Sequence, residues 1–351
     1  MLVALDLTGD VITYSYFDGQ GITTEKLGNM VGYRTGDLFQ NEAGLTALLR
    51  VAKDMIGYTG VTITEAVFAL PVYCNYAGRE RVKKAAEACG IKVRIMVKGS
   101  LASALQLYQT EALDGKTVFL CTVHSDYAEY LVFHVDGEVL SVLGSATISY
   151  TREAVAGDAN DLLKKTMDEL KALYAELGMG VGEKDEALYI TADDQAGPAA
   201  ELFPRILEAT FARSPVFLDH DPARGALCHL MKLADFQSDT IRKCFLVDCS
   251  VEGISIGSGV GGDLQEVFRR NCPLPVQNTV SLSISYDNVL CFYAGNYRNR
   301  DYDEPIGTCR IPEQYRSQSV SVKITLNAEG IVEYVVLDKN KQIIYPRRTL
   351  N

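Results

Sequence analysis

The sequence lacks the features that mark membrane-spanning, exported or nucleic-acid-binding proteins. None of its apolar runs approaches the roughly 18 residues of a membrane span. The N-terminus, MLVALD, has no basic residue before Asp6, so we expect no signal peptide. With 34 basic and 45 acidic residues the net charge is −11, whereas a polyanionic partner needs a basic face. We therefore expect a cytoplasmic protein that binds neither membranes nor nucleic acid.

Metal and redox motifs are missing as well. The nine cysteines form no C-x-x-C pair, and the four histidines lack the spacing of metal ligands. Most cysteines have aliphatic or aromatic neighbours, as Cys121 and Cys291 do, which indicates buried, reduced thiols. The spacing of the Ser, Cys, His, Asp and Asn residues indicates no Ser-His-Asp or Cys-His-Asn catalytic arrangement.

What is present is enough apolar material for more than one domain. The chain has 351 residues, of which 47% are apolar and 23% charged, an ordinary globular composition. Residues 1–240 carry a net charge of −12 and residues 241–351 a net charge of +1. Strands alternate with helices before residue 240, and only β-rich segments follow it. We predict two domains, 1–240 and 241–351.

Residues 1–240 repeat one pattern. A strand pair opens each half, at 2–16 and at 117–135, and helices and strands follow it. This repetition predicts two related α/β lobes, about 1–113 and about 114–240. The expected helices are 42–56, 78–89, 100–108, 159–177 and 197–212, and the expected single strands are 66–70, 91–97 and 188–191.

Residues 241–351 are typical of a β-sandwich. Short β-rich runs alternate with turns such as Asp287-Asn288, and no segment has a helical period. The apolar stretch around 237–247 is expected to be a linker able to dock on the first domain. The expected strands are 244–248, 253–257, 279–285, 288–294, 319–326 and 331–337.

Several motifs resemble the 70-kDa heat-shock chaperones of the DnaK type. Residues 64–75, TEAVFALPVYCN, are similar to the family pattern T-E-A-V-I-T-V-P-A-Y-F-N, and a helix leading to Gly90-Ile91 follows, as in the family. Four further motifs keep the family's order in the second domain: Asp248…Ser255-Ile256-Gly257, Arg270–Pro275, Ile306–Pro312 and Asn327–Val332.

The resemblance implies a two-lobed, actin-like (ribonuclease H-like) ATPase-type domain followed by a β-sandwich. It also implies ATP or ADP with Mg²⁺ as cofactors, and extended apolar peptides or a protein client as partners. Because the chain is short and stops at Asn351, the resemblance further implies reduced peripheral inserts and no helical lid.

The nucleotide motifs depart from the family pattern. The first phosphate loop, D-L-G-T-T-N, falls on residues 6–11, where Gly9 and Asp10 replace the two hydroxyl residues. The second, D-L-G-G-G-T-F-D, falls on residues 122–129, TVHSDYAE, and has no glycine. Glycine lets backbone N–H groups approach phosphate closely, so these losses predict weak or lost ATPase activity. The family's E-P-T-A-A-A glutamate falls on Gly99, and its G-G-x-x-x-x-P motif falls on residues 192–198.

Some residues nevertheless match positions that bind nucleotide in the family. Asp6 would bind Mg²⁺ as well as nucleotide, although an aspartate at the end of a strand equally well caps a turn. Four further acidic residues would form a cation-binding cleft between the lobes or be solvated turn residues, namely Asp10, Asp126, Asp193 and Asp194. The candidate nucleotide-binding residues are Asp6, Thr8, Gly9, Asp126 and Asp193.

In the second domain, Ile256 and Val260 match the family's peptide-facing loop, and Asn288 and Leu290 match the strand opposite. An apolar pocket there would hold one aliphatic side chain while a strand edge bonds the peptide backbone. The same residues also fit the core of a plain sandwich.

Three functions remain open. The first is a chaperone-like module that binds peptides or a protein and has lost most of its ATPase activity. The second is a working ATP-dependent chaperone with a nucleotide site rebuilt around Asp6. The third is an actin-like scaffold that assembles with itself or with a partner.

Overall fold

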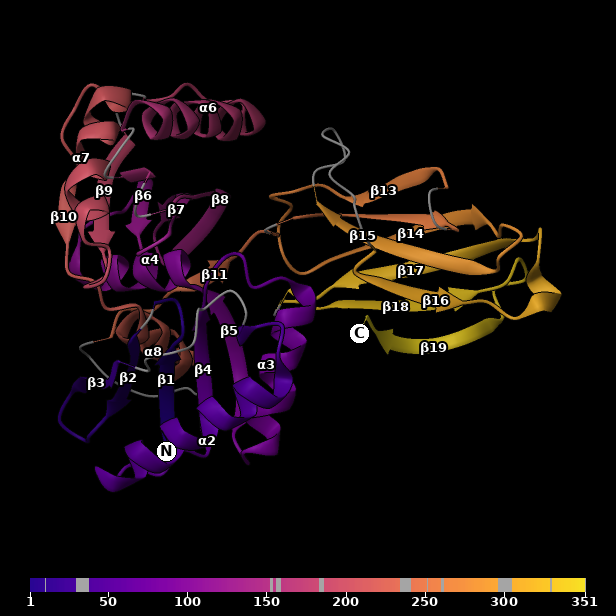
Figure 1. Cartoon of the computed structure of the whole chain (residues 1–351), viewed down its shortest axis with the longest axis horizontal. Coiled ribbons are helices and arrows are strands. Elements are labelled where there is room, and N and C mark those ends of the chain that lie inside the picture. The colour runs from indigo at the N-terminus through magenta and orange to yellow at the C-terminus, as the bar shows by residue number, and fades with distance from the viewer. Residues whose placement is uncertain are drawn as a thin grey trace. The chain divides into compact units, whose positions relative to one another are not determined.

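The chain forms two compact units, Met1–Val247 and Asp248–Asn351, and each is described by itself (Figure 1). The boundary lies seven residues after the expected one, because residues 245–247 form a strand of the first unit. The computed structural model describes residues 1–9, 11–29, 38–151, 154–155, 159–182, 186–233, 241–250, 252–259, 262–295, 305–328 and 330–350.

The first unit contains a five-stranded sheet in the order β3-β2-β1-β4-β5. Strands β1, β2 and β3 are antiparallel, whereas β4 and β5 run parallel to β1. The central strands β1 and β4 are almost fully buried, as their apolar sequences require. The bounds are β1 Leu2–Asp6, β2 Val11–Phe17, β3 Ile22–Asn29, β4 Glu65–Leu70 and β5 Lys92–Lys98.

A second sheet of the same unit repeats this order. It reads β8-β7-β6-β9-β10, with the same strand directions, and β11 is added in parallel beside β8. The internal repetition predicted from the sequence is therefore present in the topology. The bounds are β6 Thr117–Val123, β7 Tyr127–Asp136, β8 Val139–Ser149, β9 Glu186–Ala192, β10 Val216–Leu218 and β11 Phe245–Val247.

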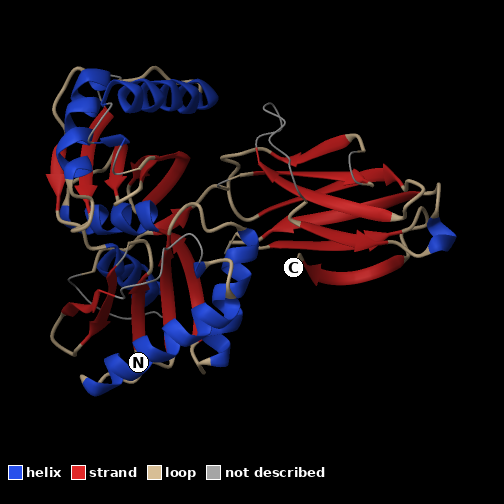
Figure 2. Ribbon diagram, in the orientation of Figure 1, coloured by secondary structure: helices blue, strands red, loops and turns tan. Residues whose placement is uncertain are grey.

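The long helices follow the same repeat: α2, α3 and α4 come after the third, fourth and fifth strand of the first sheet, and α6, α7 and α8 after those of the second (Figure 2). In α2, Leu45, Leu49 and Ala52 are among the buried residues of one apolar face, and the Asn41 side chain caps the first turn. The helix α8 escaped prediction. The bounds are α2 Glu42–Tyr58, α3 Tyr76–Ala88, α4 Gly99–Thr110, α6 Ala159–Leu177, α7 Pro198–Phe211 and α8 Pro222–Leu233.

The helices α4 and α8 pack closely against each other. A Cβ atom on Gly225 of α8 would lie 1.9 Å from the carbonyl oxygen of Ala102 in α4, so only glycine fits there. In addition, α4 contacts β4 and β5 of the first sheet and β6 and β7 of the second. This helix is therefore part of the core between the two sheets.

The second unit consists of two four-stranded antiparallel sheets, β13-β12-β15-β16 and β14-β17-β18-β19. The ring of Phe292 in β15 lies 4.9 Å from that of Tyr334 in β18, so these faces pack together. The bounds are β12 Gly253–Ser258, β13 Leu264–Phe268, β14 Val276–Ser283, β15 Val289–Gly295, β16 Gly307–Arg310, β17 Ser319–Leu326, β18 Val332–Leu337 and β19 Ile343–Thr349.

One strand prediction was assigned to the wrong unit. The strand expected at 244–248 pairs with β8 of the first unit as β11, with Phe245 opposite Val139. The sequence of a short apolar run does not indicate which sheet edge it will pair with, because the pairing partner is distant in sequence.

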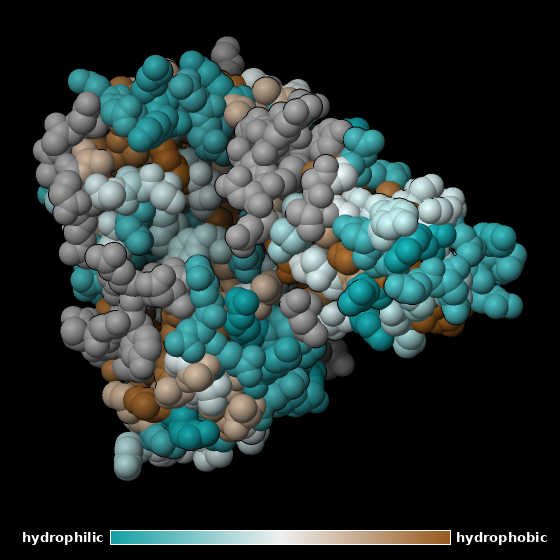
Figure 3. Space-filling view, turned by 45° about the vertical axis from the view of Figure 1, so that its right-hand side comes forward, coloured by the Kyte–Doolittle hydropathy of each residue, from teal (hydrophilic) through white to brown (hydrophobic). Residues whose placement is uncertain are grey.

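In the described part of the chain, no helix is long and apolar enough to cross a membrane. On the face seen in Figure 3, hydrophobic groups appear as small patches among hydrophilic ones. Single exposed apolar side chains are normal on a globular surface and carry no further conclusion.

Candidate functional site

The turn after β1 is built on a buried carboxylate. The Asp6 side chain is 3% exposed, and its Oδ1 atom accepts hydrogen bonds from the Thr8 backbone N–H at 2.9 Å and the Thr8 hydroxyl at 2.7 Å. Burial raises the pKa of Asp6 from 3.8 to about 6, although the bonds from Thr8 and the charge of His124 act against the rise. Asp6 is therefore close to half-protonated near pH 6.

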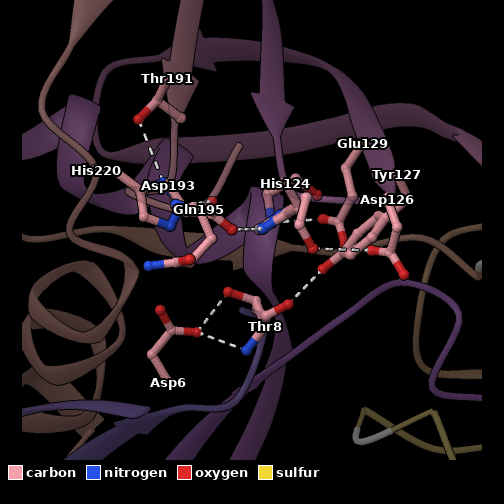
Figure 4. A network of polar contacts seen from close by, with 12 residues as sticks. Asp6, Thr8, His124, Asp126, Tyr127, Glu129, Thr191, Asp193, Gln195 and His220 are labelled. Carbon is pink, nitrogen blue, oxygen red and sulfur yellow. Dashed lines mark hydrogen bonds and ion pairs between the residues drawn. The ribbon is translucent and has the colours of Figure 1, made fainter. Parts of the chain in front are cut away.

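A buried ion pair lies at the corresponding turn of the second sheet. His124 Nδ1 is 2.9 Å from Asp193 Oδ2, and the side chains are 1% and 10% exposed (Figure 4). Burial disfavours both charges, but the hydrogen bond between the two groups prevails, so the pKa of His124 is raised and that of Asp193 lowered. The His124 ring also stacks on Tyr127, with centroids 4.2 Å apart. Both shifts favour the charged form of each partner.

A small cavity of about 40 Å³ brings these turns together. Lys26 and Asp194 form an ion pair at its wall, and burial lowers the pKa of His220 to about 3, so this histidine is neutral. Among the described residues, three carboxylates thus face the cavity. Its lining consists of Asp6, Gly9, Val11, Thr13, Lys26, Asp193, Asp194, Gln195 and His220.

Four backbone N–H groups around the cavity donate to protein acceptors. That of Thr8 donates to Asp6, and that of His124 donates to the Tyr127 carbonyl at 2.9 Å. The Asp193 N–H donates to the Val123 carbonyl at 3.0 Å, and the Gln195 N–H to Asp193 Oδ1 at 2.9 Å. A phosphate-binding loop needs such groups free and convergent. These turns hold their own structure instead.

Two glycines, at positions 9 and 99, show how closely the turns pack. A Cβ atom on Gly9 would lie 3.1 Å from Asp193 Oδ2. A Cβ atom on Gly99, the first residue of α4, would lie 2.3 Å from Thr8 Cγ2. No larger side chain therefore fits at position 99 unless Thr8 moves.

The turns of the two sheets are also joined directly. The Tyr127 hydroxyl donates to the Thr8 carbonyl at 2.7 Å, and the Tyr127 ring meets Tyr73 edge-on at 4.9 Å. Glu129 of β7 is completely buried and accepts bonds from the Val72 and Ser100 N–H groups at 2.7 and 2.8 Å. The carboxyl-end turns of the two sheets thus form one connected polar network.

Comparison with known proteins gives partial matches. No family model matches the chain. A chaperone protein dnaK of Emiliania huxleyi is 27% identical over 157 residues, 44% of this chain. A heat shock protein 70 homologue of Schizosaccharomyces pombe is 28% identical over 109 residues, 31% of this chain. The chain resembles the 70-kDa heat-shock chaperones over part of its length. The matched stretches span 22% and 19% of those relatives.

Three of the five nucleotide-site candidates taken from the heat-shock resemblance lie at the cavity, namely Asp6, Gly9 and Asp193. Thr8 is buried behind Asp6, and Asp126 is exposed and not part of the lining. Asp10 lies outside the described residues.

Four side chains at or beside the cavity were missed: Lys26, His124, Gln195 and His220. In the sequence, the one signal for these four was His124, a histidine beside a turn. The signal could be interpreted only after the structure placed Asp193 next to it. Within the described residues, no three His, Cys, Asp or Glu side chains come together as a metal site would require.

Three of the four candidate peptide-binding residues are buried. Ile256 and Leu290 have no exposed surface, and Asn288 is 2% exposed with a positive φ of 55°. Ile256 pairs across the sheet with Phe292, whose ring faces the other sheet, so Ile256 and Leu290 are core residues in this conformation. Val260 lies outside the described residues.

Proposed function

We propose that this protein is a chaperone-like binder of extended protein segments or of a protein partner, and that it does not hydrolyse ATP. In this proposal the first unit is a two-lobed, actin-like domain and the second is a β-sandwich. The repeated sheet order, the two antiparallel sheets and the resemblance to heat-shock chaperones support it.

The observation that carries the proposal is the state of the N–H groups around the cavity. Those of Thr8, His124 and Asp193 donate to protein acceptors, so they do not converge on a phosphate. The lining also carries the carboxylates of Asp6, Asp193 and Asp194, and its lysine, Lys26, is already paired with Asp194, so the site offers a polyphosphate little positive charge. The residues at the cavity therefore do not fit Mg-ATP or Mg-ADP, and the proposed function includes no reaction of a nucleotide.

Titration of Mg-ATP and Mg-ADP into the full chain by calorimetry tests this. We expect no binding tighter than about 1 mM, because the donors for phosphate are occupied. Asp6→Ala serves as the matched variant. Micromolar binding that disappears in Asp6→Ala would overturn the proposal.

That opposite outcome would favour the second function, an ATP-dependent chaperone with a rebuilt site. The specific observation behind it is Asp6, a buried carboxylate with its pKa raised to about 6 at the wall of a cavity. Such perturbed groups are often functional. Hydrolysis sensitive to Asp6→Ala would establish this function.

A test of client binding needs a substitution that leaves the core of the second unit intact. Tyr286 is 81% exposed, and the Arg316 guanidinium lies 4.8 Å above its ring. It belongs to the turn at 285–288, which packs on Gly259 beside the predicted peptide-facing loop. Exposed aromatic side chains are frequent binding anchors, so we expect Tyr286→Asp to weaken binding of a fluorescent apolar peptide about tenfold.

The matched control is Tyr58→Asp in α2 of the first unit, where Tyr58 is 91% exposed. Fluorescence anisotropy should show unchanged peptide affinity for this control. Equal loss in both variants, or none in Tyr286→Asp, would argue against peptide binding at this end of the second unit.

A further inference from the structure

The helix α2 carries a second apolar stripe, outside the face that packs on the core. Val51, Met55 and Tyr58 are 46%, 38% and 91% exposed. Residues spaced by three or four positions share one side of a helix, and Ala47, which is also exposed, extends the line toward the N-terminus. These four residues are here called the outer stripe. An exposed apolar stripe with this spacing is typical of a surface that binds another helix.

The side chains of the outer stripe are graded in size along the helix. Gly44 and Ala47 lie in the N-terminal half of α2, and the largest side chain of the stripe, Tyr58, is the last residue of the helix. A second copy of α2, packed antiparallel about a two-fold axis near the middle of the stripe, places its Tyr58 over Ala47. The same axis sets Val51 of each copy against Met55 of the other. Each large side chain therefore meets a smaller one, as close packing requires.

The charges beside the outer stripe complement each other in the same arrangement. Arg50 and Asp54 are exposed on one flank of the stripe, and neither forms an ion pair with a residue that the structure describes. Two antiparallel helices related by a two-fold axis meet with the same flank, so Arg50 of each copy lies opposite Asp54 of the other. A shift of one helix by about one turn would place like charges opposite each other. Charge and side-chain size therefore favour the same register.

We propose that α2 is the interface of a symmetric dimer of this chain, in which two outer stripes pack antiparallel about a two-fold axis. Such a contact uses the same patch on both copies and closes on itself, so it makes a dimer and not a filament. One pair of helices buries less than the roughly 1,200 Å² of a standard interface, so we expect a dissociation constant of about 10–100 µM. The dimer goes beyond the proposed function and depends on neither peptide nor nucleotide binding.

Sedimentation equilibrium of the full chain tests the dimer, at about 0.15 M salt so that the net charge of −11 on each copy is screened. The average mass should rise from that of one chain toward that of two as the concentration increases from about 1 µM to about 500 µM. Met55→Asp places a charge in the middle of the outer stripe and should weaken association by about tenfold or more. The matched control is Ala209→Asp in α7, where an exposed position gains the same charge.

An exchange of charges tests the register. Arg50→Asp alone places two acidic groups opposite each other at both ion pairs, and Asp54→Arg alone places two basic groups there. Each variant by itself should therefore dimerise about fivefold more weakly than the wild type. In an equimolar mixture the new charge of each variant faces an opposite charge, so mixed dimers should form as tightly as wild-type dimers. Energy transfer between fluorescent labels on the two variants measures the mixed dimer.

Three results would overturn the proposal. The first is a wild type that stays monomeric up to about 500 µM. The second is a Met55→Asp protein that associates as the wild type does, because α2 then lies outside the interface. The third is a mixture of the two charge variants that associates no more tightly than either alone. Both charge variants change exposed groups, so they test the dimer even if Met55→Asp does not fold.

The dimer and the proposed function can fail independently. Tyr58→Asp removes the largest side chain of the outer stripe, so it should weaken association about tenfold. The same variant should keep the peptide affinity of the wild type, because Tyr58 lies in the first unit and the predicted peptide-facing loop lies in the second. Loss of association with unchanged peptide affinity supports the dimer, whereas unchanged association in Tyr58→Asp contradicts it.

Discussion

Gly225→Ala is expected to destabilise the first unit by about 3 kcal/mol. The added methyl group would lie 1.9 Å from the Ala102 carbonyl oxygen and 2.7 Å from the Gln106 nitrogen, both backbone atoms of α4. Backbone atoms inside a helix cannot turn away as a flexible side chain does, so the two helices must separate. For a unit of this size the melting temperature should fall by roughly 6–12 °C, as measured by calorimetry.

Gly57→Ala in α2 is the matched control. No atom lies within 4 Å of the position where its Cβ would stand, and alanine is the better helix former. This variant should be neutral or slightly stabilising. A Gly225→Ala protein that melts like the wild type would mean that α4 and α8 do not approach each other this closely.

The sequence predicted the elements better than it predicted their partners. The expected helix at 42–56 is observed as α2, and the helix at 159–177 as α6, because both have strong apolar periodicity. Short strands such as β10 and β11 have three residues each and carry too little pattern to be recognised or assigned to a sheet. Short length therefore explains these two failures, although the twelve-residue helix α8 was missed as well.

Residues of the candidate site could be predicted only where they align with a motif of the heat-shock family. Asp6 and Gly9 align with the first phosphate-loop motif of the heat-shock family and Asp193 with its G-G-x-x-x-x-P motif, and all three line the cavity, although their binding roles stay predictions. Burial and pairing were not predictable. His124 and Asp193 are 69 residues apart, and nothing local to either residue indicates that they form a buried ion pair. Similarly, Ile256 and Leu290 could be pocket or core residues until the facing sheet was placed.

Asp6→Asn is expected to stabilise the protein at pH 8, by about 3 kcal/mol at most. The pKa of Asp6 is raised from 3.8 to about 6, with burial as the largest cause, so the folded state holds the proton more tightly than the unfolded state. Ionising Asp6 therefore costs stability. The cost is absent below pH 3.8, grows between pH 3.8 and 6, and is complete above pH 6.

Asparagine preserves most of the local structure. Its Oδ1 atom still accepts both bonds from Thr8, and its amide group is placed to donate to the Thr13 hydroxyl, which lies 3.5 Å from Asp6 Oδ2. The advantage of the variant in urea unfolding should be largest at pH 8 and should shrink as the pH falls from 6 toward 4.

Asp18→Asn provides a control of opposite sign. Asp18 is exposed, and hydrogen bonds from the Gln20 and Gly21 N–H groups lower its pKa. Its contribution to stability is present above the ordinary aspartate pKa and is lost as the pH falls. Asp18→Asn should therefore destabilise slightly at pH 8, and the difference from the wild type should vanish in acid.

The sign of the Asp6→Asn effect also bears on function. A carboxylate that lowers stability at neutral pH, at the wall of a cavity, is the arrangement expected where ionisation serves binding or chemistry. If Asp6→Asn instead destabilises the protein at pH 8, the ionised carboxylate has a stabilising cationic partner. Repeating the measurement in the presence and absence of Mg²⁺ would then distinguish a bound cation from a partner within the chain, since only a bound cation makes the loss depend on magnesium.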